Sequence, residues 1–200
     1  MKIDEFYNNV ANEYEGMIRS PKVDARLMSK IKEIFLKHNI NEGKILDVGC
    51  GPGNLQNTLG DRFTYTGIDI SEKMLAKAKE KGYKIIHNKL EDAIVQIQDK
   101  SFDYIISSSV LHFVKDINLI IENFDRIARR GWLITLPDIT ENYIKNFPVN
   151  DPMYNHVEFP IAGTTEDVLI YGWTSPSSGE KIIERVVFKM LQYIQENFES

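Results

Sequence analysis

Cysteine is nearly absent from the 200-residue sequence. The only one is Cys50, which excludes an intramolecular disulfide and a metal site built from several thiolates. Long apolar runs are missing too: segments such as 104–106 and 132–134 are strand-sized, whereas a membrane-spanning helix needs about 20 apolar residues. The polar start shows no apolar signal segment. We therefore expect a cytoplasmic protein with no membrane association and no metal site.

An excess of basic residues is also missing. The chain has 24 Lys and Arg against 29 Asp and Glu, a net charge of −5, so its composition gives no support to a nucleic-acid-binding protein. Apolar residues make up 42% and charged residues 26% of the chain, which is typical of a folded globular protein. At this length we expect one domain, present as a monomer or a homodimer.

Apolar residues recur at helical spacing near the start and predict two helices, one near 3–14 and one near 21–38, ahead of the first strand. Five short apolar strands then alternate with helices, at 45–48, 63–68, 84–87, 102–107 and 132–136. Such alternation favours a parallel sheet that is covered by helices on both faces.

Several element boundaries carry recognisable signals. Ser71 is placed to cap the helix that follows the second strand. A helix from Ile117 is expected to end at residues 129–131, two arginines and a glycine, because cations and glycine suit a helix C-terminus. A further strand is predicted at 168–173. The apolar residues of 182–190 fit a helix or an edge strand, and we favour the helix.

The strongest chemical signal is the segment 47–53, which reads Asp-Val-Gly-Cys-Gly-Pro-Gly. A strand that runs into glycines before a helix lets the backbone approach a ligand closely, because no Cβ intervenes. Asp69 ends the second strand, 22 positions after Asp47, and a carboxylate there can accept the hydrogen bonds of a ribose diol. Both features follow strands at their carboxyl ends, where open α/β sheets bind ligands.

The spacing of these glycines separates classes of nucleotide. A dinucleotide fingerprint has glycine at positions one, three and six, but here the glycines stand at 49, 51 and 53 and the sixth position is Asn54. Asp47 would repel an anionic pyrophosphate and would suit an ammonium group. No Gly-Lys-Ser/Thr follows, which excludes a phosphate-binding loop. The sequence therefore favours a zwitterionic nucleoside ligand over a dinucleotide.

Three motifs in order resemble those of class I S-adenosylmethionine-dependent methyltransferases, in the small-molecule branch of type 11 and type 25. They are 47–53, then 65–71 with Met74, then 101–113, and the resemblance covers about residues 1–137. It implies an α/β fold, a Rossmann-like doubly wound sheet of about seven mostly parallel strands with helices on both faces and the last strand antiparallel.

The resemblance also implies how one domain, residues 1–200, is divided. Residues 1–43 form an N-terminal helical cap and residues 44–137 form the cofactor-binding core. Residues 138–200 supply a substrate-side segment and the C-terminal elements. The length of the segment 147–160 favours a lid over the acceptor, and the alternative is an ordered crossover loop packed on the core. Asp138 follows the fifth strand. We interpret it as a helix cap in preference to a residue that contacts the acceptor.

The cofactor that the resemblance implies is S-adenosyl-L-methionine, held by residues at matching motif positions. Contacts with its methionine end are assigned to Asp47, Gly49 and Gly51. Contacts with the ribose and the adenine are assigned to Asp69, Ile70, Met74, Leu90, Glu91 and Asp92. Contacts with the sulfonium and its methyl group are assigned to Ser107 and Ser108, and Tyr14 closes over the cofactor. The family often has Gly-Asp where this chain has Asn88-Lys89, so the sequence leaves open which acidic residue reaches the adenine.

The implied function is methyl transfer to an unidentified small-molecule acceptor by in-line displacement. His112, which follows the fourth strand, is the candidate general base; the alternative is a histidine hydrogen-bonded to the backbone or to the cofactor carboxylate. Two other functions stay open. One is an aminopropyl transferase on the same fold, and the other is a non-catalytic cofactor-binding or partner subunit.

Overall fold

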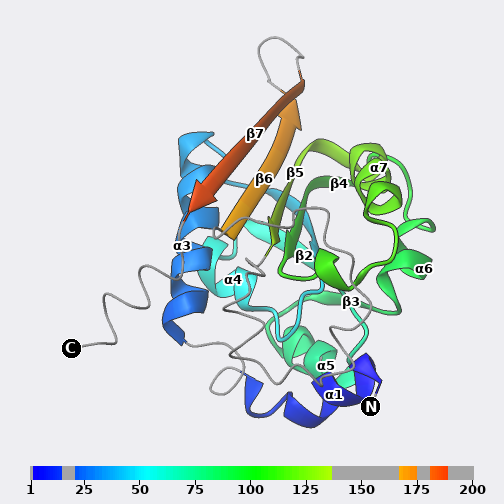
Figure 1. Cartoon of the computed structure of the whole chain (residues 1–200). Coiled ribbons are helices and arrows are strands. Elements are labelled where there is room, and N and C mark those ends of the chain that lie inside the picture. The colour runs from blue at the N-terminus through cyan, green and yellow to red at the C-terminus, as the bar shows by residue number, and fades with distance from the viewer. Residues whose placement is uncertain (1, 15–20, 137–166, 175–180, 189–200) are drawn as a thin grey trace.

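A seven-stranded sheet forms the centre of the chain in the computed structural model, which describes residues 2–14, 21–136, 167–174 and 181–188 (Figure 1). The strand order is β3-β2-β1-β4-β5-β6-β7, and β1 to β5 are parallel. The strands are β1 (Gly43–Val48), β2 (Phe63–Asp69), β3 (Lys84–His87), β4 (Phe102–Ser108), β5 (Ala128–Leu136), β6 (Asp167–Thr174) and β7 (Lys181–Phe188). The predicted α/β sheet of about seven mostly parallel strands is confirmed.

The last two strands form an antiparallel hairpin at one edge of the sheet. The strand β6 pairs antiparallel with β5, and β7 pairs antiparallel with β6, so β7 runs in the direction of β1 to β5. The last strand was expected to be antiparallel to the others. The strand that runs antiparallel to β1–β5 is instead the sixth, β6, and β7 is antiparallel only to β6. The helix favoured over 182–190 is wrong for 181–188. Its β-branched residues, Ile182, Ile183, Val186 and Val187, suit a strand better than a helix.

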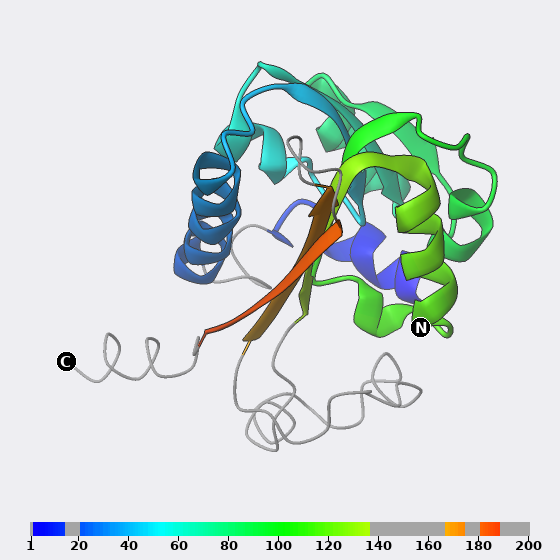
Figure 2. The same ribbon diagram turned by 90° about the horizontal axis from the view of Figure 1, so that it is seen from above.

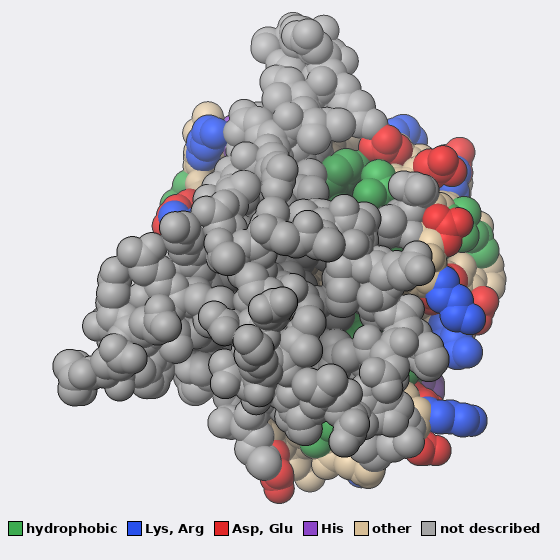
Figure 3. Space-filling view, viewed as in Figure 1, with side chains coloured by type: hydrophobic (Ala, Val, Ile, Leu, Met, Phe, Trp, Pro, Cys, Tyr) green, Lys and Arg blue, Asp and Glu red, His purple; other side chains and the backbone are tan. Residues whose placement is uncertain are grey.

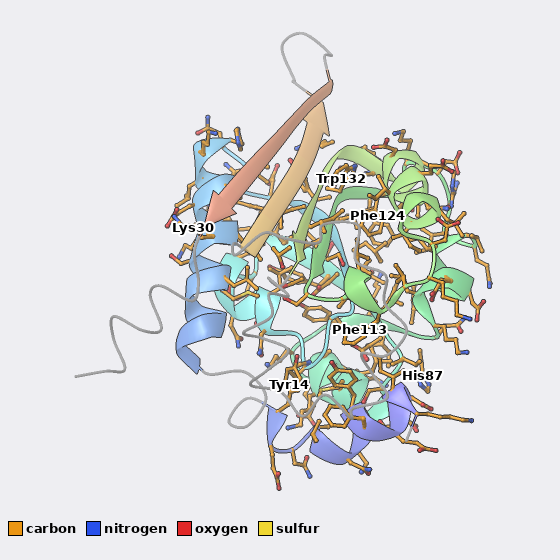
Figure 4. All side chains as sticks on the ribbon, viewed as in Figure 1. Tyr14, Lys30, His87, Phe113, Phe124 and Trp132 are labelled. Carbon is orange, nitrogen blue, oxygen red and sulfur yellow. The ribbon has the colours of Figure 1, made fainter. Side chains whose placement is uncertain are left out.

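Helices cover both faces of this sheet, as Figure 2 shows from above. They are α1 (Ile3–Val10), α3 (Pro21–Lys37), α4 (Asn54–Leu59), α5 (Glu72–Glu80), α6 (Leu90–Ile94) and α7 (Ile117–Ile127). On one face, residues of α3, α4 and α5 pack against alternate strand residues such as Ile45 and Ile106. On the other, α6 and α7 pack against strand residues of the opposite parity, among them Trp132 beside Phe124 (Figure 4). The alternation of strand side chains therefore supplies two apolar layers.

Two helix ends test the boundary signals. Ser71 caps α5 as predicted, because its hydroxyl accepts a hydrogen bond from the Met74 N–H at 3.2 Å. The predicted end of α7 is wrong: the helix stops at Ile127, and Arg129 and Arg130 lie on β5. The C-terminal carbonyls of α7 are instead bound by a distant ammonium group, that of Lys100, which donates to the carbonyl oxygens of Asp125 and Ala128 at 2.9 and 2.7 Å.

The two arginines have partners along the sheet. The Arg129 guanidinium forms a salt bridge of 3.0 Å with Asp103. Arg130 lies over the ring of Tyr104, 6.0 Å from its centroid. Burial alone would raise the pKa of Asp103, but hydrogen bonds from the Lys44 N–H and from Arg129 outweigh burial and hold this pKa below its ordinary value.

The described surface is mixed in charge. On the face drawn in Figure 3, acidic and basic side chains are interspersed along the edge formed by α6 and α7. Within the described ranges, no helix combines the length and the apolar character that a membrane crossing requires.

Candidate functional site

A cleft of about 370 Å³ opens at the carboxyl ends of β1, β2 and β4, within the size range of small-molecule sites. Its walls come from the glycine loop after β1, from the end of β2 and from the segment that follows β4. The helix α1 and the short 3-10 turn η1 (Leu111–Phe113) also contribute side chains. This is the edge at which open parallel sheets bind ligands.

The glycine loop turns sharply at the end of β1. The N–H groups of Gly49 and Cys50 both donate to the carbonyl oxygen of Ile68, at 2.8 and 3.1 Å. Gly49 has a left-handed φ of 67°, and a Cβ there would stand 2.0 Å from Cγ2 of Val110, so only glycine fits. Gly51 has a φ of 51° and lines the cleft, with no described atom within 4 Å of the place of a Cβ. The loop therefore offers bare backbone to a ligand.

Asp69 stands at the end of β2 and faces this loop. Its Oδ2 accepts a hydrogen bond of 2.9 Å from the Gly51 N–H, and its Oδ1 accepts one of 2.8 Å from the Ser71 N–H. Burial raises the pKa of Asp69, and these two N–H groups and the nearby His87 oppose the rise. Each carboxylate oxygen has a second lone pair, so Asp69 can still accept hydrogen bonds from a ligand.

Asp47 lies one residue before the end of β1 and has only 4% of its surface exposed. Its Oδ2 accepts a hydrogen bond of 3.0 Å from the Tyr83 hydroxyl. Burial raises the pKa of Asp47 from its ordinary 3.8 to about 7; the hydrogen bond from Tyr83 opposes this rise and the charge of Asp69 adds to it.

Asp47 and Asp69 have no oppositely charged side chain bound to them among the described residues. Buried carboxylates that share one cleft disfavour each other's ionisation, and a cationic ligand group relieves that cost.

The structure brings most of the predicted site residues to the cleft. Those that line it are Tyr14, Asp47, Gly49, Gly51, Asp69, Ile70, Met74, Leu90, Glu91 and Ser108. The predicted acidic pair is separated: Glu91 lines the cleft, whereas Asp92 is exposed in the first turn of α6 and lies outside it.

Besides Asp92, Ser107 is the predicted cofactor-binding residue that does not line the cleft. Side chains alternate along β4, so Ile106 and Ser108 face the cleft while Ser107 shares the opposite face with Ile105. Ser107 is completely buried there, and its hydroxyl has no hydrogen-bond partner among the described residues. The placement of Ser107 beside the transferring methyl group is therefore not supported by the side-chain geometry.

The candidate general base is placed only through its backbone. His112 belongs to η1, between the buried Leu111 and Phe113, which lines the cleft. The side chain of His112 is outside the described part of the structure. Asp138 and the expected lid at 147–160 also lie outside the described residues.

Two aromatic side chains at the cleft, Tyr7 and Phe113, are not among the predicted site residues. The Tyr7 ring meets Phe113 edge to face at a centroid distance of 6.3 Å, and it meets Tyr14 at 6.1 Å. All three line the cleft, and Figure 4 shows Tyr14 and Phe113 at the end of the molecule where α1 lies. The helical spacing of apolar residues on α1 selects Phe6 and not Tyr7. The one signal for Tyr7 in the sequence is that it directly follows Phe6.

The helix α1 is fixed on α5 by one amide side chain. Oδ1 of Asn8 accepts a hydrogen bond of 2.8 Å from the Ser71 hydroxyl and one of 3.1 Å from the Lys73 N–H. Asn8 therefore joins the helix that carries Tyr7 to the turn that follows Asp69.

Known proteins match this chain in sequence and in fold. Residues 46–135 match a family model described as a methyltransferase domain, and this range contains the glycine loop and Asp69. Over this range the chain is therefore similar to the methyltransferase domains of that family.

Two sequence relatives show how far the likeness to known proteins extends. An uncharacterized protein of Methanocaldococcus jannaschii is 32% identical over 101 residues, 50% of this chain and 47% of the relative. The demethylmenaquinone methyltransferase of Staphylococcus aureus is 25% identical over 173 residues, 81% of this chain and 70% of the relative. The chain thus spans about half the length of the first relative.

One solved structure shows the same fold over nearly the whole chain. It is an S-adenosylmethionine-dependent methyltransferase of Thermotoga maritima, described as a possible histamine N-methyltransferase. Its TM-score is 0.59 at 17% identity, and the match covers 92% of this chain and 93% of the other. At this identity the likeness concerns the fold alone.

The cofactor of this family, S-adenosyl-L-methionine, fits the residues of the cleft. It carries an ammonium and a sulfonium cation, and the cleft is lined by the buried Asp47 and the half-buried Asp69, neither of which forms a salt bridge with another described residue. It is also a bulky ligand that needs close contact with backbone, which the open side of Gly51 permits. The chemistry of the donor set and the shape of the loop therefore agree with the family.

Proposed function

We propose that the chain transfers the methyl group of S-adenosylmethionine to a small-molecule acceptor bound in the same cleft. One observation carries the proposal: a glycine loop and two carboxylates, the buried Asp47 and the half-buried Asp69, meet in a cleft that aromatic side chains also line. The loop and the carboxylates suit a cationic nucleoside, and the aromatic side chains provide room and contacts for a second molecule.

Each part of the cofactor has a proposed partner. Asp47 accepts hydrogen bonds from the ammonium group, next to the bare backbone of Gly49 and Gly51. Asp69 accepts the two ribose hydroxyls through its remaining lone pairs. The adenine is proposed to lie against apolar and acidic residues of the cleft wall, namely Ile70, Met74, Leu90 and Glu91.

When bound, the cofactor supplies an electrophilic methyl group on its sulfonium. The task of the protein is to hold the acceptor atom in line with that methyl group, about 3 Å away, and to keep water out. Ser108 lines the cleft and accepts a hydrogen bond of 3.3 Å from the Thr135 hydroxyl. We propose that Ser108, which this hydrogen bond ties to Thr135 on the neighbouring strand β5, forms the wall beside the transferring methyl group.

The acceptor end of the cleft is proposed to be the aromatic cluster of Tyr7, Tyr14 and Phe113. Such rings bind planar or apolar faces by stacking and edge contacts, and they also bind cationic groups. The acceptor class is therefore a small organic molecule with an apolar or aromatic face. Demethylmenaquinone, which names the relative from Staphylococcus aureus, is the first compound to include in a panel.

His112 is proposed as the general base for an acceptor that arrives protonated. Its backbone adjoins Phe113 at the aromatic end of the cleft, within η1. A positioned base of this kind contributes a factor of about 10² to 10⁴ in rate. The alternative proposal is a positioning histidine, and the two differ in whether the pH dependence of turnover changes when His112 is replaced by Ala.

Transfer of a labelled methyl group from S-adenosylmethionine to a panel of acceptors tests the proposed function. We expect a methylated product whose formation falls at least about tenfold in Asp69→Asn, because a hydrogen bond to a charged group contributes roughly 1.5–3 kcal/mol. Asp92→Asn is the matched control, since this neighbouring acid lies outside the cleft. Equal loss in both variants contradicts the assigned site.

Decarboxylated S-adenosylmethionine separates the alternatives on the same fold. An aminopropyl transferase prefers this compound to the carboxylated cofactor. A non-catalytic cofactor-binding subunit binds the carboxylated cofactor but yields no product from any acceptor. Preference for the decarboxylated compound would overturn the methyl-transfer proposal.

A further inference from the structure

Tyr83 is a buried tyrosine that lies behind the cleft and does not line it. It follows α5 and directly precedes β3, and 4% of its surface is exposed. Its ring stacks on Tyr65 at a centroid distance of 5.0 Å and an interplanar angle of 17°. A Cβ added at Gly53 or at Gly67 would stand 3.0 Å from this ring. Packing on these sides leaves the ring no freedom to rotate away.

The fixed ring aims one polar group at the site. The Tyr83 hydroxyl donates a hydrogen bond of 3.0 Å to Oδ2 of Asp47, and both residues are buried. Burial raises the pKa of Tyr83, and so does the charge of Asp47, so the phenol keeps its proton and remains a donor.

We propose that Tyr83 is a positioning residue that keeps the Asp47 carboxylate ionised and oriented for a cationic group of the bound ligand. The inference rests on the proposed function, because the cationic group is the ammonium of the cofactor. Tyr83 itself touches neither cofactor nor acceptor; it acts through Asp47 alone.

The groups around Asp47 make this hydrogen bond important. Asp69, at the end of β2, raises the pKa of Asp47 through its negative charge, in addition to the larger effect of burial. The Cys50 thiol and the Tyr65 phenol also face this region, and burial raises the pKa of both, which keeps them neutral. Lys81 donates to Oδ1 of Asn54 at 2.8 Å. Among these neighbours, the Tyr83 hydroxyl is the donor bonded to Asp47 and lowers its pKa.

The consequence concerns the pH at which the ligand binds. The ammonium group prefers the ionised form of Asp47, so affinity falls as the pH falls through the pKa of Asp47 near 7. Without the Tyr83 hydroxyl this pKa rises further. The pH midpoint of binding then moves upward, while a purely structural role for Tyr83 would weaken binding equally at every pH.

Calorimetric titration of S-adenosylhomocysteine into Tyr83→Phe between pH 6 and 9 tests the proposal. This demethylated product retains the ammonium group. We expect the midpoint to move upward by about one pH unit, which corresponds to about tenfold weaker binding below the midpoint. The matched control is Tyr65→Phe, which removes a hydroxyl from the same stacked pair, one that donates to the Gly60 carbonyl at 2.8 Å instead of to Asp47. That variant should keep the midpoint of the wild type.

Two further measurements keep the test decisive. In Asp47→Asn the affinity should lose its pH dependence near neutrality; if the dependence persists, Asp47 does not govern binding and the proposal is overturned. An unchanged midpoint in Tyr83→Phe overturns it as well.

The ligand-free protein separates failure of this inference from failure of the proposed function. A carbon NMR titration of the Asp47 carboxyl group needs no ligand, and its midpoint should also rise in Tyr83→Phe. A shifted NMR midpoint in a protein that binds no S-adenosylhomocysteine refutes the proposed function and leaves the control of Asp47 by Tyr83 standing. An unshifted NMR midpoint refutes the control itself.

Discussion

Replacing Asp47 by Asn should make the ligand-free protein more stable at alkaline pH while it weakens cofactor binding. Asp47 is buried at the end of β1 without a salt bridge in the described part of the chain. The folded chain therefore bears the cost of an ionised carboxylate whenever the pH exceeds its pKa. Asn keeps an oxygen that can accept from Tyr83 and carries no charge.

The pKa values set the size and the sign of the effect. The pKa of Asp47 is raised from 3.8 to about 7, so its contribution to stability is complete below pH 3.8 and is lost as the pH rises through 7. One pKa unit corresponds to about 1.4 kcal/mol, so the ionised form costs the folded chain up to about 4 kcal/mol at pH 8.5. We expect Asp47→Asn to recover about 2–4 kcal/mol at pH 8.5, somewhat less than half as much at pH 5, where the carboxyl of the unfolded chain is already ionised, and almost nothing below pH 3.8.

Urea unfolding of both proteins from pH 5 to 8.5, without ligand, measures this difference. The control is Asp92→Asn, an exposed acid near the same edge, whose stability should follow the wild type at every pH. A difference between Asp47→Asn and wild type that does not grow with pH would refute the reasoning, as would a variant that is less stable at pH 8.5.

Three other substitutions test separate parts of the account. Asn8→Ala removes the hydrogen-bond acceptor that joins α1 to α5. We expect the free energy of unfolding in urea to fall by about 1–2 kcal/mol and the binding of S-adenosylhomocysteine to weaken. An unchanged affinity would show that α1 does not shape the cleft. Ser107→Ala removes a buried hydroxyl that has no hydrogen-bond partner among the described residues, and its unfolding free energy should equal or exceed that of the wild type by up to about 1 kcal/mol; a loss of affinity for S-adenosylhomocysteine would restore Ser107 to the site. Gly49→Ala places a Cβ against Val110 at a left-handed φ and should lower the unfolding free energy by more than about 2 kcal/mol, a larger loss than at Gly51, whose φ is also left-handed but where a Cβ meets nothing within 4 Å.

The cofactor side of the cleft could be predicted from sequence because local rules determine it. Asp47 and Asp69 each end a parallel strand, and neighbouring parallel strands bring their carboxyl ends together. The glycines identify the loop between them, since their left-handed φ values are those that other residues avoid. Strand order alone is therefore enough to predict that these residues meet at one edge of the sheet.

Features that depend on distant contacts were beyond such rules. Tyr83 reaches Asp47 across 36 positions of sequence, and Lys100 binds the end of α7 across 25. Ser107 was misplaced because a one-residue change of parity moves a strand side chain to the other face. The edge strand β7 carries apolar residues that fit two periods, and pairing with β6 decides between them.

The division of the chain into a cap, a core and a substrate-side segment stays a prediction. The described residues of the cap and core do share one cleft, because Tyr7 and Tyr14 line it together with Asp47 and Asp69. Residues 138–166 lie outside the part of the chain that the structure describes. Their proposed role as a cover for the acceptor therefore rests on the sequence alone.

Calorimetric titration of S-adenosylhomocysteine at pH 8.5, where Asp47 is ionised, tests the central claim most directly. The account predicts one site per chain, an affinity at least about tenfold weaker in Asp69→Asn, and no change in Asp92→Asn. Absence of binding to the wild-type chain, or equal affinity in wild type and Asp69→Asn, would contradict the assignment of the cleft.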